Sequence, residues 1–131
     1  MSTRKKGKKA AETVSSINIP ESEWGGFLET FSSRHHGWLV QLETYDFVTR
    51  EEVVSREMPL QSIELDLEDV KNPRINVTIQ FDNKVIKHIL FLPSQLVLTS
   101  SDDDREQSLQ VETVNTETTV RFRAPVPIPP A

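Results

Sequence analysis

Three histidines are the residues of this chain best suited to acid–base or metal chemistry. They are His35, His36 and His88. A metal site would need one of the adjacent pair together with His88 and a carboxylate. Adjacent histidines on a helix point in different directions, and the nearby carboxylates fall on strand positions that face solvent. We therefore predict no metal site. His35 and His36 add charge at a helix end, and His88 faces the core from a strand.

Two acidic clusters have the composition of a cation or acid–base site but not its pattern. Asp102–Asp104 lacks the alternating ligands and the glycine of a calcium loop, so a solvated turn is predicted. Glu64, Asp66 and Glu68 share one wet strand face, which lacks the contrasting environments that paired acid–base catalysis needs. The chain has no cysteine and only four glycines, and no phosphate loop or hydrolase motif is present. No catalytic residue and no cofactor is predicted.

The charge of the chain is divided between a basic start and an acidic remainder. Residues 1–13 carry five basic side chains and one acid, which is +4, so the rest of a chain of net charge −5 sums to −9. The basic side chains are Arg4, Lys5, Lys6, Lys8 and Lys9. They are candidate contacts for an anionic partner, and a solvated tail that aids solubility is the alternative.

Length and composition predict one domain between two tails. A chain of 131 residues is too short for two independent cores. Residues 1–16 are polar and lack periodicity, which predicts a mobile tail, and residues 125–131 are proline-rich and predict an extended tail. Residues 17–124 form the domain. No apolar run suits a secretory signal or a membrane span, so we expect a cytoplasmic protein without membrane contact.

An amphipathic helix is predicted at the start of this domain, because four large apolar side chains recur at i, i+3, i+4 and i+7. They are Trp24, Phe27, Leu28 and Phe31. Ser22 is the predicted N-cap, and Gly37 supplies the left-handed residue that ends helices. Gly25 and Gly26 lower helix stability, so we expect them to allow close approach to a sheet.

After Gly37 the hydrophobic period changes to two residues, which predicts about eight short strands joined by hairpins. A turn at Asp82-Asn83 places Ile86, His88 and Leu90 on one inward face. The other predicted inward positions are Trp38, Val40, Leu42, Ile63, Leu65, Leu67, Ile75, Val77, Ile79, Phe81, Leu96, Leu98, Leu109, Val111, Val120 and Phe122. The predicted fold is α+β and mostly β, an antiparallel meander curled into a sheet or partly open barrel with the helix as its plug.

Several segments together resemble a bacterial family called domain of unknown function 5335. They are the helix running into Ser33–Trp38, the junction Pro59–Ile63, His88-Ile89 followed by Pro93, and the closing Thr119–Pro125. The resemblance covers about residues 21–125. It departs at Asn115-Thr116, where the family tends to have Asp-Gly, and in the Asp102–Arg105 loop, where a glycine is usual. It implies a small bacterial cytosolic protein and brings no established activity.

Three functions follow from these observations as hypotheses. The first is a non-enzymatic interaction or assembly module with a protein partner, because the motifs of catalysis are missing. The second is a nucleic-acid or ribosome-associated protein that uses the basic residues Arg4 to Lys9. The third is a small-molecule binder or enzyme centred on His88, with His36 as a further pocket residue.

Overall fold

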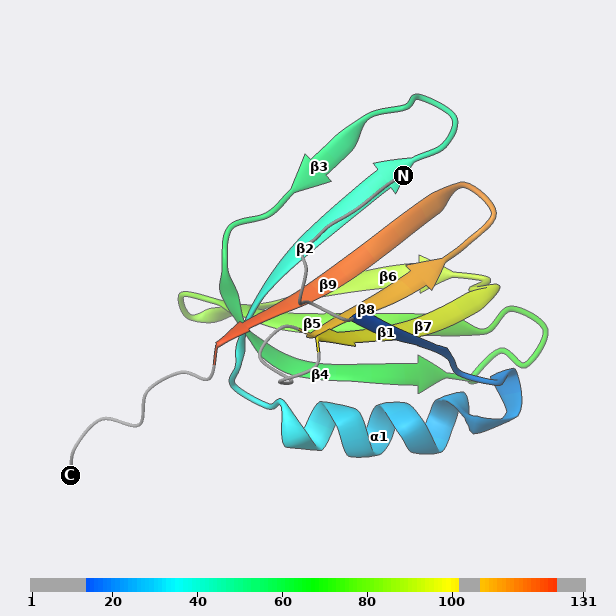
Figure 1. The fold of residues 1–131 in the computed structure, drawn as a ribbon, viewed down its shortest axis with the longest axis horizontal. Coiled ribbons are helices and arrows are strands. Elements are labelled where there is room, and N and C mark those ends of the chain that lie inside the picture. Colours follow the sequence, from blue (N-terminus) through cyan, green and yellow to red (C-terminus); the bar gives the residue numbers. More distant parts are fainter. Residues whose placement is uncertain (1–13, 102–106, 125–131) are drawn as a thin grey trace.

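A computed structural model describes residues 14–101 and 107–124, which form one sheet with a helix beside it (Figure 1). The elements in chain order are β1 (Val14–Asn18), the 3-10 turn η2 (Glu21–Glu23), α1 (Trp24–Arg34), β2 (Leu39–Asp46), β3 (Glu52–Val54), β4 (Met58–Asp66), β5 (Arg74–Phe81), β6 (Lys84–Phe91), β7 (Gln95–Ser101), β8 (Gln107–Glu112) and β9 (Thr116–Ala124). The predicted fold class, α+β and mostly β, is confirmed.

The strands are antiparallel and follow the order β1-β7-β8-β9-β2-β4-β5-β6, with β3 beside β2. The sheet is open, since β1 and β6 are its two ends. The hairpins β4-β5-β6 and β7-β8-β9 agree with the predicted meander. The pairs β1-β7 and β9-β2 do not, so a simple meander is wrong. Hairpin signals identify only neighbours in sequence, whereas these two pairs join strands that lie far apart along the chain.

Strand β4 divides the sheet into two leaves. Its first residues, Met58 and Pro59, pair with Val40 and Leu39 of β2. From Leu60 onward it pairs with β5, and a register irregularity between Leu60 and Ser62 bends the strand. One leaf therefore contains β1, β7, β8, β9, β2 and β3, and the other contains β4, β5 and β6.

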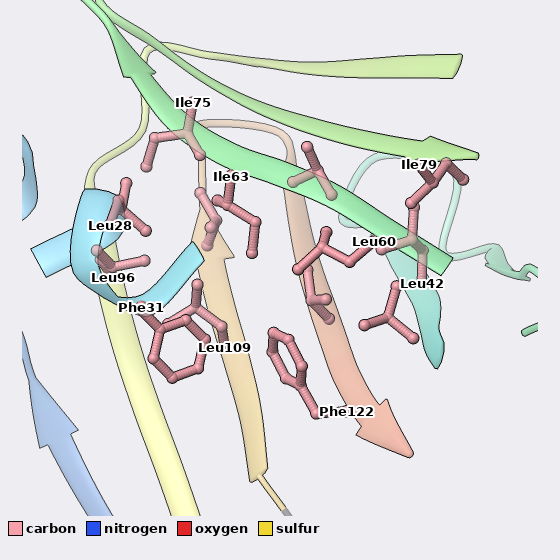
Figure 2. Close-up of a cluster of buried hydrophobic side chains, with 14 of the residues drawn as sticks. Leu28, Phe31, Leu42, Leu60, Ile63, Ile75, Ile79, Leu96, Leu109 and Phe122 are labelled. Carbon is pink, nitrogen blue, oxygen red and sulfur yellow. The ribbon is translucent and has the colours of Figure 1, made fainter. Parts of the chain in front are cut away.

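The hydrophobic core lies between the two leaves. Figure 2 shows Ile75 and Ile79 of β5 on one side, Leu109 and Phe122 on the other, and Phe31 of α1 among them. The predicted inward positions that are buried are Val40, Leu42, Ile63, Ile75, Val77, Ile79, Leu96, Leu109, Val111, Val120 and Phe122. Alternation therefore identified the core face of most strands. Leu67 is an exception, because β4 ends at Asp66 and leaves it exposed.

The predicted plug is confirmed, although its N-terminal cap is not. Trp24, Leu28 and Phe31 are buried, and the Trp24 indole nitrogen donates to the carbonyl of Ile19 at 2.8 Å. The helix begins after the 3-10 turn, and the N-cap position, Glu23, makes no side-chain capping bond. The predicted cap at Ser22 is therefore wrong, because that residue lies inside the turn.

The predicted boundary of the N-terminal tail needs a correction. Strand β1 begins at Val14 and pairs with β7, so the last three residues of the predicted tail belong to the sheet. The strand was not predicted because β1 has only two apolar residues, Val14 and Ile17, at positions that do not alternate. The structure places Ile17, which is exposed, opposite Leu98. Residues 1–13 and 125–131, and the Asp102–Asp104 turn, lie outside the described residues.

Two glycines of the helix region should respond oppositely to alanine. A Cβ at Gly26 would meet nothing within 4 Å, whereas Gly37 has a φ of 85°. We expect Gly26→Ala to raise the free energy of unfolding by about 0.5–1 kcal/mol, because alanine loses less backbone entropy. Gly37→Ala should lower it by about 1–2 kcal/mol, because alanine is strained at that φ. Urea denaturation measures both, and a stabilised Gly37→Ala variant would contradict the helix end described here.

Candidate functional site

The structure separates the two histidines that were predicted to share a pocket. His36 follows α1 and donates from Nδ1 to the carbonyl of Gln61 in β4 at 2.9 Å. His88 lies in β6, and β5 runs between β4 and β6. A single site containing both side chains is therefore wrong. The basic candidates Arg4 to Lys9 lie outside the described residues.

His35 is a core residue rather than a surface charge, which corrects the prediction. It is 6% exposed, and its Nδ1 donates to the carbonyl of Phe31 at 2.8 Å. Its Nε2 lies 2.9 Å from Oε1 of Gln107. Its ring packs against Phe31, Trp38 and Phe122, at centroid distances of 4.2, 4.7 and 4.8 Å. The spacing from Phe31 to His35 is i to i+4, so the helical period contained the signal that places this ring inside.

A polar groove of about 690 Å³ runs between α1 and β4. Its lining residues are Gly25, Glu29, Ser32, Ser33, His36, Gln61, Ser62, Ile63, Glu64 and Leu65. The helix side and the strand side touch at the floor, where the amide of Ile63 donates to Oγ of Ser32 at 2.9 Å. Gly25 of the helix lies close to Leu65 of β4, since a Cβ added at Gly25 would lie 3.8 Å from Cδ2 of Leu65. The predicted close approach therefore holds for Gly25 and not for Gly26.

Two polar side chains of this groove are engaged in holding β4. Ser32 and His36 bond the backbone of β4 at Ile63 and Gln61, on the side that β2 has left. A side-chain oxygen that accepts from a buried amide is a poor nucleophile without a neighbouring base. Within residues 14–101 and 107–124, no group of three or more histidine or acidic side chains is placed to hold a metal ion. The groove therefore acts as the joint between helix and sheet.

The acidic face of β4 is also engaged, at Asp66. Its carboxylate accepts from the amide of Glu68 at 2.9 Å and from the Asn76 side chain at 3.3 Å, and Arg74 lies 3.7 Å away. The Glu68 amide is the main cause that lowers the pKa of Asp66 below its ordinary value, followed by the Asn76 and Arg74 contacts. An ionised carboxylate with these partners stabilises the end of β4 and has no proton to donate near neutral pH.

His88 lies on the predicted face but not in the core. It is opposite Val77, whose side chain is buried, so its ring points to the inner side of the sheet. Because β6 is an end strand, His88 is nevertheless exposed, and so are Val85 and Ile89 on the other face of the strand. Partial dehydration lowers the pKa of His88 below its ordinary value of 6.5. The prediction of a core-facing histidine is therefore right about the face and wrong about burial.

The backbone of β6 has a free side. In the part of the chain that the structure describes, the only neighbour of β6 in the sheet is β5. Just beyond β6, the amide of Leu92 donates to the carbonyl of Pro73 at 2.9 Å, and the antiparallel register continues through the whole strand. Hydrogen-bonded positions alternate in such a pair, so the even-numbered residues of β6 bond to β5. The residues that direct their amides and carbonyls to the free side are Val85, Lys87, Ile89 and Phe91.

Apolar side chains accompany this free backbone. Val85, Ile89 and Phe91 are 60%, 40% and 58% exposed, and Ile86 on the other face is 37% exposed. A hollow of about 310 Å³ lies between the end of β6 and the β8-β9 turn, bounded by Ile89 to Leu92 on one side and by residues 113–116 on the other. We refer to β6 with these exposed side chains as the β6 edge.

A model of a family of unknown function, DUF5335, matches residues 15–131. The chain belongs to the DUF5335 family. The predicted resemblance is thus confirmed over a longer stretch than expected, and the match includes most of β1 in the DUF5335 chain. No curated protein and no solved structure was found to match it. No helix in the described part of the DUF5335 chain is long and apolar enough to cross a membrane.

The β6 edge of this DUF5335 protein was not among the predicted sites. Its signal in the sequence is an apolar run that alternation does not explain, because Val85 and Ile86 occupy both faces, as do Ile89 and Leu90. A strand with one wet face should carry polar residues at every second position. Here Lys87 is the only charged residue between Val85 and Phe91.

The joint between α1 and β4 can be tested with two neighbouring serines. Ser32→Ala should lower the free energy of unfolding by about 1–3 kcal/mol, because the amide of Ile63 would lose its partner at a buried position. Ser33 is exposed on the same helix, so Ser33→Ala should change it by less than about 0.5 kcal/mol. Urea denaturation of the two variants gives the comparison. Equal effects would show that the Ser32 bond does not hold the joint.

Proposed function

We propose that this protein is a non-enzymatic interaction module that binds a protein partner by strand addition at the β6 edge. The observation that carries the proposal is the edge itself. Val85, Ile89 and Phe91 expose apolar side chains beside backbone groups that lack a neighbouring strand among the described residues. An added strand would bond those groups and cover those side chains.

The composition of the edge supports a binding role. Natural sheets usually protect an end strand with charged side chains, lysine above all, or with proline, bulges, inward-pointing charges or a short length, since an unprotected edge associates with other chains. β6 spans Lys84–Phe91, has no proline, and pairs with β5 without a register shift. Its central lysine, Lys87, lies on the outer face rather than pointing inward, because its partner on β5 is Thr78. β6 does carry two lysines, Lys84 and Lys87, but its length, its regular register and its apolar side chains on both faces suit the addition of a partner strand.

The other candidate surfaces support binding less well. The groove between α1 and β4 uses Ser32 and His36 to bond the backbone of β4. On β9, Arg121 pairs with Glu43 at 2.6 Å and Arg123 pairs with Glu57 at 3.3 Å. These two arginines form ion pairs with carboxylates of the same chain, which stabilises the fold at the surface. Two other strands, β3 and β1, also have a single neighbour among the described residues and expose Val53, Val54 and Ile17. They span only three and five residues, whereas β6 spans eight, so β6 is the longest of the three edges.

A proline at an outward-directed position tests the proposal. Lys87→Pro removes an amide that points to the free side and leaves the bonds to β5 intact, so the fold should be retained. Partner capture from a lysate of the native host should fall by at least roughly tenfold, because the proline blocks strand addition. Lys87→Ala is the matched control, since it removes the same charge and keeps the amide.

The controls separate three possible outcomes of this experiment. Capture by wild type and Lys87→Ala, with loss in Lys87→Pro, supports strand addition at β6. Equal capture by all three folded proteins overturns it. A chain lacking residues 1–13 goes through the same assay, and partners lost only in that variant would instead support the hypothesis that Arg4 to Lys9 bind nucleic acid or the ribosome. Circular dichroism and melting temperature check that each variant folds.

A further inference from the structure

We propose that the strand added to β6 is β6 of a second copy, paired antiparallel with His88 at the two-fold axis. This inference rests on the function proposed above and names its partner. The two copies form one continuous sheet through their β6 edges. The argument uses three properties of the strand: which face each side chain occupies, which backbone groups are free, and where the charges lie.

Two-fold symmetry restricts the register. Residues directly opposite each other in an antiparallel pair point to the same face of the sheet. A two-fold axis perpendicular to the sheet keeps the inner face of one copy beside the inner face of the other. An odd-numbered residue must therefore oppose an odd-numbered one, which places a residue opposite its own copy at the centre. The central positions of β6 that qualify are Lys87, His88 and Ile89.

The free backbone groups distinguish these three registers. Only odd-numbered residues of β6 offer amides and carbonyls to the free side. Centring on His88 pairs Val85 with Phe91 and Lys87 with Ile89, each twice, which gives about eight hydrogen bonds between the copies. Centring on Lys87 or on Ile89 leaves one end residue unpaired within the strand and gives about six. The backbone thus favours the register centred on His88.

The charges agree with the backbone. The strand carries Lys84 and Lys87 and no carboxylate. A register centred on Lys87 would place two like charges directly opposite each other, which is destabilising. In the register centred on His88, Lys87 lies opposite Ile89, and Lys84 falls beyond the paired stretch. Neither lysine then directly opposes another charge of β6, and the two Lys87 side chains are diagonal neighbours that can turn away from each other into solvent.

The side chains complement each other in the same register. On the outer face Val85 of each copy lies opposite Phe91 of the other. On the inner face Ile86 lies opposite Leu90. These are the apolar residues that the single chain leaves exposed or half-buried. A second copy therefore covers the apolar surface on both faces of the edge, which an extended peptide of arbitrary sequence would not match.

The central pair makes the dimer sensitive to acid. His88 lies opposite Val77 of β5, and the next inner-face residues of β5 are the apolar Ile75 and Ile79. On the inner face of β6 itself, the charged residue is Lys84. Neither β5 nor β6 carries a carboxylate on this face that could neutralise an imidazolium. Neutral rings can lie opposite each other, whereas two protonated rings repel. Because partial dehydration lowers the pKa of His88 below the ordinary 6.5, its ring is neutral at neutral pH, so the dimer should persist there and weaken in acid.

Single cysteines report the register directly, since the chain has none of its own. Opposed residues at a non-hydrogen-bonded position have Cα atoms about 4.5 Å apart, which a disulfide can span. His88→Cys should therefore form a disulfide-linked dimer under mild oxidation at least roughly tenfold faster than Lys87→Cys or Ile89→Cys, which would be offset from their own copies. All three variants are full-length chains, circular dichroism checks that each folds, and non-reducing electrophoresis gives the rates.

Sedimentation equilibrium of the unmodified chain supplies the second measurement. The dissociation constant should be roughly fivefold higher at about pH 5.5 than at about pH 7.5, and His88→Gln should remove that difference while keeping the dimer. Faster crosslinking at position 87 or 89 overturns the register, and a dimer with no pH dependence overturns the acid sensitivity assigned to the His88 pair. A chain that stays monomeric overturns the self-association, and partner capture that is still lost in Lys87→Pro would then leave the proposed function standing.

Discussion

The need to satisfy the backbone of β4 determines how the rest of this protein is built. A strand that leaves its neighbour exposes amides and carbonyls, and such groups are unfavourable inside a protein unless they find partners. β4 leaves β2 after Pro59, and α1 takes the place of the missing strand. Ser32 bonds the amide of Ile63 and His36 bonds the carbonyl of Gln61. The sheet can therefore open into two leaves and enclose a core without leaving its bend unsatisfied.

Much of this architecture follows from local pattern. Trp24, Leu28 and Phe31 specify a helix and its buried face, and the alternation at Ile75, Val77 and Ile79 specifies a core strand. Pattern does not say which strands become neighbours. The pairing of β1 with β7 and of β9 with β2 depends on how the leaves close over the core, which is a property of the whole chain. The fold class was therefore predictable, and the strand order was predictable only within hairpins.

The candidate sites show the same division between local and global information. The inward face of His88 followed from the hairpin turn, but its exposure follows from the position of β6 at the end of the sheet. His35 was assigned to the surface because charge at a helix end is common, yet its ring completes an aromatic cluster with Phe31 and Phe122. Residue type suggested chemistry at both positions. Their neighbours in the fold decided what each histidine does.

The adjacency of β2 and β9 has a consequence for how the chain acquires its fold. All the strands from β3 to β8 lie between these two in sequence, so their pairing has a high contact order and forms slowly compared with the hairpins. During translation, β4, β5 and β6 can pair as soon as they emerge from the ribosome. β2 must wait until β9 has been synthesised. Until β9 is available, the apolar face of the β4-β5-β6 leaf lacks the β2-β9 pair that covers it in the finished fold, and exposed apolar surface of this kind favours aggregation.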